Sequence, residues 1–258
     1  MAIKSDRRNF TVKSSRREMK FHGLSACLEL CRVRPQDIIR MYLTETRLGV
    51  FSPALRYIAK ERKAYHLVGN EDLERLTETI HHQGICVLAY EHEETSFQQV
   101  LSSLRGNSAR TLWVYLDGVE NPHNLGAIMR SCAHFGVSYL FGAAARLPRL
   151  SASACRVAEG GAEHVRLVFL KDPLAQLSEL RAQGFTLMAT SLQGESLFSA
   201  PMPDRTLMIL GSELYGISPE LLKITGRKVT IPGTGRVESL NVSAAFAVIA
   251  AEYGRQQP

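Results

Sequence analysis

Apolar residues change between helical and strand spacing along the first third of the chain. Between Phe21 and about Tyr90 this pattern predicts helices over 23–31, 53–62 and 71–80, and strands over 37–44, 64–69 and 84–90. Pro53 suits the first turn of its helix, because the N–H that proline lacks would have no partner there. The pattern therefore predicts a compact α/β module over residues 21–95.

From residue 111 onward the predicted strands are nearly unbroken apolar runs with helical stretches between them. The strands are expected at 111–117, 138–142, 165–170, 185–191, 206–211 and 228–232, and the helices at 125–136, 158–165, 173–184 and 218–226. Strands of this kind are typical of a parallel sheet covered on both faces. The polar stretch between the two patterns contains one helix-like run that ends at Gly106. We therefore expect a linker over 96–110 and a second domain over 111–258.

Length and composition are those of a globular chain with one large domain or two modest ones, and we expect two. The chain has 258 residues, of which 45% are hydrophobic and 22% are charged. No apolar stretch approaches the roughly 20 residues of a membrane span, and the first residues lack the apolar core of a signal peptide. We expect a cytoplasmic protein without a membrane partner.

The five cysteines are odd in number, scattered and without a CxxC spacing. This pattern favours buried free thiols over a disulfide framework or a zinc site, so no metal ligand is predicted.

Positive charge is concentrated at the start of the chain. The formal net charge is +6, and residues 1–20 carry seven Lys or Arg against two Asp or Glu, a net of +5. We expect residues 1–20 to form a disordered basic tail. Such a tail can neutralise phosphates of a nucleic acid, but it can equally serve only to keep the protein soluble.

Three segments rich in glycine and polar residues follow predicted strands, at 117–130, 211–218 and 232–241. In parallel α/β sheets, ligands bind beyond the carboxyl ends of the strands. These segments are therefore candidates for one shared site.

The first two segments combine an amide, a guanidinium and a carboxylate. Asn124 is expected in a loop that opens the helix carrying Arg130, an arrangement that suits an anionic, hydroxyl-bearing ligand. The alternative is a helix cap followed by an arginine on the surface. Glu213 lies between Gly211 and Gly216, which allows close backbone contact with a flat ligand, but a solvated carboxylate in a turn explains it equally well.

The third segment, "IPGTGRVESLN", places Arg236, Glu238, Ser239 and Asn241 before an alanine-rich helix. Helix capping explains one or two of these polar residues but not all of them. Its GxG lacks the third glycine of a dinucleotide fingerprint, and the chain has no GxxxxGK[ST], GxSxG or HExxH motif. A nicotinamide-dependent enzyme is thus only weakly supported.

Taken together and in order, "NPHNLGAIMRSCAHFG", "LGSELYG" and "IPGTGRVESLNVSAA" resemble motifs 1, 2 and 3 of the SpoU (TrmH-like) family of RNA ribose 2′-O-methyltransferases in the SPOUT class. The resemblance covers residues 112–255. The first module, from "FHGLSACLEL" to "HHQGICVLAY", is similar to the L30e-like substrate-binding domain that precedes the catalytic domain in many members.

The resemblance implies a SPOUT-type parallel sheet whose C-terminal segment forms a trefoil knot, an exception to the unknotted topology of most proteins. It implies S-adenosylmethionine as cofactor, RNA as substrate, with ribosomal RNA favoured slightly over transfer RNA, and a homodimer packed through the helices after Asn241 and around Arg130. The implied catalytic residues are Asn124, Arg130, Glu213, Ser239 and Asn241, and the implied cofactor-binding residues are Leu210, Gly211, Gly216, Ile231, Ser239 and Leu240.

Two departures from the family pattern stand out. Gly233 occupies the place of the methionine that usually follows Ile-Pro, which we expect to loosen a wall of the cofactor pocket. The segment "AEGGAEHV" at 158–165 lacks the small Ser-Ala pair often found before its Gly-Ala.

The family proposal makes Arg130 the general base, which is chemically difficult because a guanidinium has a pKa above about 12. We expect Arg130 to anchor the phosphate next to the target ribose, with Glu213 or Ser239 assisting proton removal. The alternative from another class is a catalytically inactive RNA-binding protein of the same fold.

Overall fold

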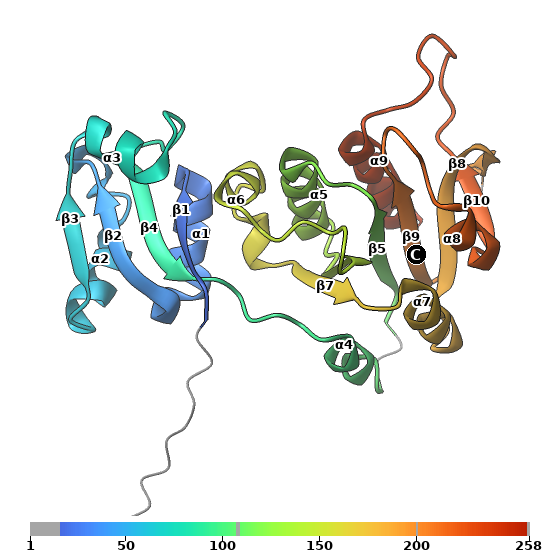
Figure 1. Cartoon of the computed structure of the whole chain (residues 1–258), viewed down its shortest axis with the longest axis horizontal. Coiled ribbons are helices and arrows are strands. Elements are labelled where there is room, and N and C mark those ends of the chain that lie inside the picture. Colours follow the sequence, from blue (N-terminus) through green and yellow to red (C-terminus); the bar gives the residue numbers. More distant parts are fainter. Residues whose placement is uncertain (1–15, 107–108, 200, 257–258) are drawn as a thin grey trace, which may run out of the picture.

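The computed structural model shows two α/β modules side by side along the long axis of the molecule (Figure 1). The structure describes residues 16–106, 109–199 and 201–256. The first module is a four-stranded sheet in the order β1-β4-β2-β3. Its elements are β1 (Glu18–His22), α1 (Leu24–Val33), η1 (Pro35–Asp37), β2 (Ile38–Leu43), η2 (Glu45–Arg47), α2 (Ser52–Lys60), β3 (Ala64–Leu67), α3 (Asn70–Thr77) and β4 (Ile85–Tyr90).

All three helices and three strands predicted for this module are present, but β1 was missed. Residues 16–20 were assigned to a disordered tail, and this assignment is wrong, because β1 pairs antiparallel with β4 and Glu18 stands opposite Tyr90. Arg16 is also held, by Asp37 at 2.6 Å. The remainder of the predicted tail, residues 1–15, lies outside the described residues.

The second module is a six-stranded sheet in the order β10-β8-β9-β5-β6-β7, and all its pairings are parallel. The predicted fold class is therefore confirmed, while the trefoil knot stays a prediction. Its strands are β5 (Thr111–Asp117), β6 (Tyr139–Ala143), β7 (Arg166–Leu170), β8 (Thr186–Ser196), β9 (Arg205–Gly211) and β10 (Arg227–Thr230). Its helices are α4 (Phe97–Ser103), α5 (Pro122–His134), α6 (Ala152–Val157), η3 (Gly161–Glu163), α7 (Pro173–Ala182), α8 (Pro219–Ile224) and α9 (Val242–Arg255).

Both faces of this sheet are covered, as the continuous apolar strands predicted. Leu112, Val114 and Leu116 of β5 belong to one core with α5, α6 and α9. Trp113 and Tyr115 point the other way, into a second core with α4, α7 and α8. Because α4 contributes Phe97 and Val100 to this second core, the segment predicted as a linker packs onto the second module.

One predicted helix, over 158–165, is wrong. The helix there is α6, which ends at Val157, and the chain then passes through Glu159 and Gly160 with φ of 49° and 90° before the short 3-10 turn η3. Positive φ at two successive residues is incompatible with a right-handed helix, which explains the break.

The cysteines are free, as predicted. Cys27, Cys86, Cys132 and Cys155 are buried and Cys31 is half-buried. Within the described ranges, no group of three His, Cys, Asp or Glu side chains could hold a metal ion, and no helix is both long and apolar enough to cross a membrane.

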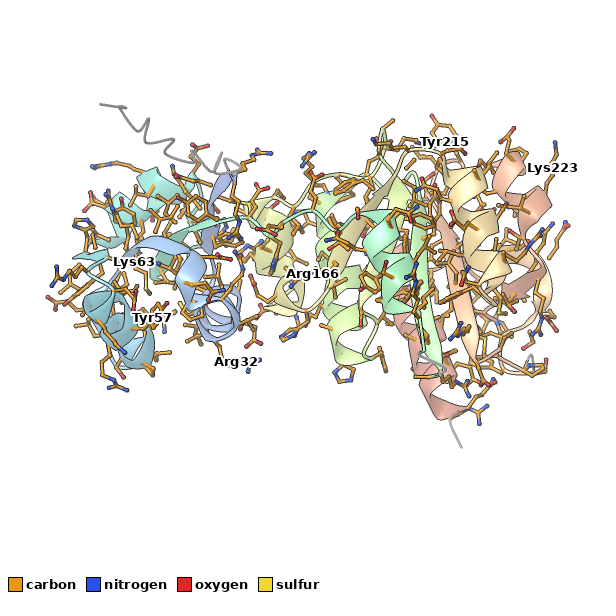
Figure 2. All side chains as sticks on the ribbon, turned by 90° about the horizontal axis from the view of Figure 1, so that it is seen from below. Arg32, Tyr57, Lys63, Arg166, Tyr215 and Lys223 are labelled. Carbon is orange, nitrogen blue, oxygen red and sulfur yellow. The ribbon has the colours of Figure 1, made fainter. Side chains whose placement is uncertain are left out.

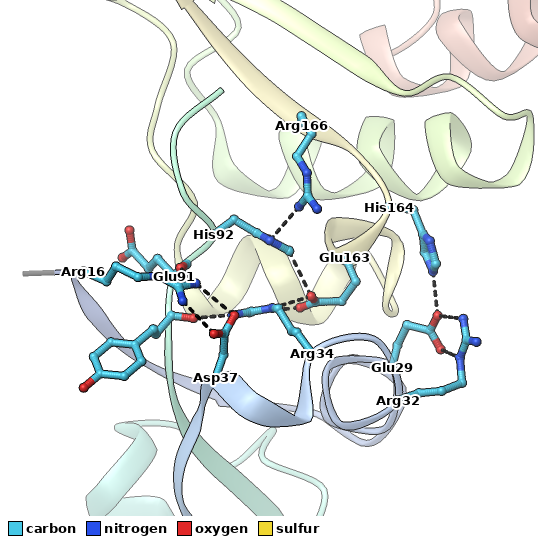
Figure 3. A network of polar contacts seen from close by, with 11 residues as sticks. Arg16, Glu29, Arg32, Arg34, Asp37, Glu91, His92, Glu163, His164 and Arg166 are labelled. Carbon is cyan, nitrogen blue, oxygen red and sulfur yellow. Dashed lines mark hydrogen bonds and ion pairs between the residues drawn. The ribbon is translucent and has the colours of Figure 1, made fainter. Parts of the chain in front are cut away.

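A polar network joins the two modules where α1 faces η3 (Figure 3). Arg34 donates to both carboxylate oxygens of Glu163, at 2.6 and 3.2 Å, and both side chains are almost fully buried. Arg34 also donates to the carbonyl of Tyr90 and to Asp37, which in turn pairs with Arg16.

His92 and Arg166 extend this network on the side of the second module, and Figure 2 shows Arg166 between the modules. Arg166 Nη1 lies 2.6 Å from His92 Nδ1, and His92 Nε2 lies 2.9 Å from Glu163 Oε2. The His92–Glu163 contact is close enough for an ion pair, but its geometry is not that of a hydrogen bond. His92 Nε2 therefore has no hydrogen-bond partner among the described residues. Burial opposes the charge of Glu163, but the contacts from His92 and Arg34 outweigh it and hold the pKa of this carboxyl below its usual value.

Candidate active site

The three predicted segments meet beyond the carboxyl ends of the central strands. β5 and β9 are neighbours in register, with Asp117 opposite Gly211 at their last residues. The segment after β5 leads into α5, the segment after β9 forms a tight turn, and the segment after β10 leads into α9. This is the position at which open α/β sheets bind ligands.

Three predicted catalytic residues, one from each segment, form a closed set of hydrogen bonds. Asn124 Nδ2 donates to Glu213 Oε1 at 2.7 Å. Asn241 Nδ2 donates to the same oxygen at 3.2 Å and to Asn124 Oδ1 at 3.1 Å. Glu213 and Asn241 are exposed and Asn124 is half-buried, so the cluster faces solvent. We call these three residues the polar triad.

Local structure explains why each triad residue lies where it does. Asn121, not Asn124, caps α5, because its side chain accepts from the N–H of His123 at 2.8 Å. The prediction that Asn124 belongs to a loop is thus wrong: it lies in the first turn of α5, whose exposed side faces Glu213. Asn241 caps α9 through its Oδ1, which accepts from the N–H of Ser243 at 3.0 Å, while its Nδ2 serves the triad.

Arg130 lies further along α5 and is exposed. It makes no hydrogen bond or ion pair to the polar triad in the described residues, so its guanidinium is available to an anion. Ser239 and Leu240 are also exposed, in the segment just before Asn241, and Ile231 is half-buried just after β10.

The turn after β9 is built so that only glycine fits at its base. A Cβ on Gly211 would lie 2.5 Å from both the carbonyl oxygen of Gly216 and the nitrogen of Ile217. The turn is closed by hydrogen bonds from the N–H of Gly216 to the Ser212 carbonyl at 2.9 Å and from the N–H of Tyr215 to Ser212 Oγ at 3.1 Å. Tyr215, at the tip, is 83% exposed and lies on the surface in Figure 2.

Asp117 anchors this turn, a role that sequence reasoning missed. It is buried at the end of β5, where its carbonyl accepts from the N–H of Ser212 at 3.0 Å and its Oδ2 accepts from the N–H of Ser218 at 2.7 Å. Arg146 lies 3.7 Å from its other oxygen and covers Gly118. The only sequence signal was a carboxylate ending an otherwise apolar run.

The residues present fit an adenosyl cofactor. Gly211 offers its backbone without a side chain, and Leu210 before it in β9 is buried. Ile231 after β10 is half-buried and Leu240 is exposed, so both present apolar surface. No backbone-to-backbone hydrogen bond is formed by residues 231–240 within the described chain, so their C=O groups, and their N–H groups except at Pro232, which has none, remain free for solvent or a ligand. Gly233 is exposed and a Cβ there would touch nothing within 4 Å, so the expectation that it loosens a wall of the cofactor pocket stays a prediction.

Two family models match this chain, one over each module. Residues 111–251 match the family model of the SpoU rRNA Methylase family, and residues 22–95 match that for RNA 2′-O ribose methyltransferase substrate binding. The chain is 38% identical over 240 residues to "Uncharacterized tRNA/rRNA methyltransferase YfiF" of Escherichia coli O157:H7, covering 93% of this chain and 68% of the relative. It is 35% identical to an uncharacterized tRNA/rRNA methyltransferase of Haemophilus influenzae, covering 77% of this chain but only 56% of the relative.

A third relative aligns over nearly its whole length. It is the 23S rRNA (guanosine-2′-O-)-methyltransferase RlmB of Neisseria meningitidis serogroup B, 28% identical, with 92% of this chain and 94% of the relative covered. Among solved structures, a putative RNA methyltransferase of the TrmH family from Porphyromonas gingivalis superposes with a TM-score of 0.74 at 25% identity, covering 93% of this chain and 90% of the other. The SpoU methyltransferase AviRb of Streptomyces viridochromogenes, in complex with AdoMet, shares the fold with a TM-score of 0.74 at 20% identity, covering the same shares of both chains.

Proposed function

Since the chain belongs to the SpoU rRNA methylase family, we propose that it methylates a ribose 2′-oxygen of structured RNA. Family membership makes the protein an S-adenosylmethionine-dependent tRNA/rRNA methyltransferase. The observation that carries the finer proposal is the polar triad. One amide from each of two segments and a carboxylate from a third converge beyond β5 and β9, where a hydroxyl can be held.

S-adenosylmethionine would be held by the backbone of Gly211, Ile231 and Leu240, with Leu210, Gly216 and Ser239 around it. When bound, it supplies an activated methyl group attached to a sulfonium. The chain must then align the ribose oxygen with that methyl group and accept the proton of the hydroxyl. Alignment of this kind can lower a barrier by about 7 to 11 kcal/mol in favourable cases.

Glu213 is the residue best placed to accept a hydrogen bond from the hydroxyl. Its Oε1 already accepts from Asn124 and Asn241, whereas Oε2 makes no hydrogen bond within the described residues. The two amides fix the carboxylate and leave its second oxygen for the substrate. Ser239, exposed two residues before Asn241, is the second candidate to assist proton removal.

Arg130 would anchor the phosphate next to the target ribose. A guanidinium offers a planar fork of donors that matches phosphate, and because it keeps its proton near neutral pH it is a poor base. Arg130 is exposed and unpaired in the described chain, so RNA phosphate does not have to displace a protein partner.

Ribosomal RNA is the substrate class we favour. The relative named 23S rRNA (guanosine-2′-O-)-methyltransferase aligns over both modules, including the region that matches the substrate-binding model. Double-stranded RNA is recognised largely by shape and backbone contacts, which suits a separate recognition module. The cytoplasmic location expected from the sequence stays a prediction.

A homodimer through α5 and α9 belongs to the same proposal. Light scattering of the purified chain tests it, and a monomer mass at micromolar concentration would contradict it.

The reaction is tested by incubating the protein with radiolabelled S-adenosylmethionine and either transfer RNA or protein-free ribosomal RNA, followed by digestion and analysis for 2′-O-methylnucleosides. Label in one RNA, lost in Arg130→Ala, supports the reaction and identifies the substrate class. Intact cofactor binding without label in either RNA points to a ribonucleoprotein or precursor substrate. Neither label nor cofactor binding points to a catalytically inactive RNA-binding protein.

A further inference from the structure

The segment Gly160–Glu163 lies between the two modules and touches both. On one side, a Cβ at Gly160 would lie 2.8 Å from the Cβ of Glu29 and 3.4 Å from the Ser25 carbonyl, so α1 packs directly on this glycine. On the other side, a Cβ at Gly161 would lie 2.9 Å from the Met129 carbonyl. Two successive glycines thus allow the segment to contact α1 and α5 at once.

The contact on α5 falls at Arg130. The Cα and N atoms of Arg130 would lie 3.0 and 3.2 Å from a Cβ on Gly161, so η3 packs against the backbone that carries the guanidinium. Glu163, two residues later, is held by Arg34 of the first module in the buried ion pair. Figure 3 shows the Arg34–Glu163 end of this line of contacts, and the close approach of Gly161 to the Arg130 backbone continues it onto α5.

A buried ion pair of this kind tolerates little displacement. Separating Arg34 from Glu163 would leave two charges in a site with almost no solvent access, which is strongly unfavourable. The exposed pair at the same joint, between His164 and Glu29, lacks that constraint because solvent screens it.

We propose that Arg34, Glu163 and the paired glycines Gly160–Gly161 are positioning residues. They hold the part of α5 that carries Arg130 in a fixed position relative to the first module. The inference rests on the function proposed above for Arg130 and deepens it. RNA held by the first module and RNA phosphate held by Arg130 are then kept at a set separation. The first module acts on the reaction through η3 and not only through its affinity for RNA.

The test measures single-turnover methyl transfer at saturating RNA and cofactor, together with the affinities for each. Glu163→Gln keeps the size of the side chain and removes its charge. It should slow transfer by about 10-fold to 100-fold, because small misplacements near reacting groups have effects of this size, while cofactor affinity stays within about twofold. Glu71→Gln, which removes an exposed ion pair with Arg75 within α3 of the first module, is the matched control.

A double variant separates positioning from stability. Arg34→Met with Glu163→Leu removes both buried charges, so its unfolding midpoint should recover relative to Arg34→Met alone. Its methyl-transfer rate should stay low, because a Met–Leu contact lacks the two directional hydrogen bonds that Arg34 donates to Glu163. Recovery of the rate together with stability would show a purely structural role and overturn the proposal.

Hydrogen exchange provides a readout that does not need activity. In Glu163→Gln, amides of α5 around Arg130 should exchange about 10-fold faster while those of β9 are unchanged. Unchanged exchange in α5 overturns the proposal even if the wild-type chain methylates no RNA tested. Absence of transfer in the wild type with altered exchange would instead count against the proposed function alone.

Discussion

At the scale of single residues, the candidate site depends on side chains that each have two tasks. Asn241 caps α9 with its oxygen and serves the polar triad with its nitrogen. Asp117 ends β5 and holds the turn after β9. These side chains are positioned by the cap of a helix and the end of a strand, so no additional element is needed to place them.

Glu213→Gln should separate hydrogen bonding from proton acceptance. Glutamine retains an acceptor for Asn124 and Asn241 but cannot take the proton of a ribose hydroxyl. We expect methyl transfer to fall by about 10²- to 10⁴-fold, the usual range for loss of a general base. Stability should change by no more than about 0.5 kcal/mol, as for other surface substitutions.

The measurement is the single-turnover rate beside a thermal unfolding curve. Glu220→Gln, at an exposed glutamate in α8, is the control. A Glu213→Gln rate equal to that of the control would assign proton removal elsewhere, with Ser239 the next residue to test.

Gly211→Ala should disrupt the turn after β9, because the new Cβ has no space beside Gly216. Overpacking of this kind costs about 1 to 3 kcal/mol, and here the displaced atoms are backbone. Cofactor affinity measured by calorimetry should fall with it. Gly233→Ala, where a Cβ meets nothing, should leave both quantities unchanged, and a similar loss in both variants would contradict the assignment.

At the scale of elements, the strands and most helices could be predicted because each is marked by its own residues. The apolar runs of β5 to β10 and the helical spacing of α1, α5 and α7 are local signals. β1 was missed because "EMKFH" reads as the end of a charged tail, and its identity comes from pairing with β4, about 70 residues away. Arg34 and Glu163 stand 129 positions apart, so no local pattern reveals their ion pair.

The joint around η3 should make stability depend on pH. Hydrogen bonds from Arg32 and, to a lesser extent, His164 outweigh burial and lower the pKa of Glu29 to about 2, and the pKa of Glu163 is also lowered. The pKa of glutamate in the unfolded chain is about 4.3, so the stabilisation from these carboxylates is complete above about pH 5. That contribution is lost as the pH falls through their folded pKa values.

Urea unfolding measured between neutral pH and about pH 3.5 tests this dependence. The wild type should lose stability steadily over the acid part of the range. Glu163→Gln should be less stable at neutral pH and show a shallower slope. Parallel curves for the two proteins would mean that Glu163 is not the carboxylate responsible.

At the scale of the whole molecule, two modules share one continuous apolar core. Phe21 and Leu30 of the first module belong to the same cluster as Met129 and Cys155 of the second. Together with the buried ion pair, this contact makes the pair of modules a single packed body. We therefore expect them to unfold together in one transition rather than as independent domains.

The thiols should report on that packing. Burial raises the pKa of Cys86 to about 11 and of Cys31 and Cys155 to about 12, and it also raises the pKa values of Cys27 and Cys132 well above the usual value of a thiol. Because only the thiolate reacts readily, iodoacetamide at about pH 8 should modify the native chain slowly and the urea-unfolded chain at all five cysteines. Mass spectrometry counts the adducts, and rapid modification of Cys155 in the native chain would show that the joint between the modules opens.

The order of the strands determines when the candidate site can form during synthesis. β5 pairs with β9, which is made about 90 residues later. Asn124 is made before both of its partners, Glu213 and Asn241, and Asn241 stands at the start of the last helix. During synthesis the first module can fold early, since domains generally fold as units from the N-terminus. A nascent chain that ends before residue 232 already carries Arg130 and Glu213 but lacks the third segment of the site and α9. The first module can therefore exist before the protein is complete, whereas the polar triad closes only once the final helix has been made.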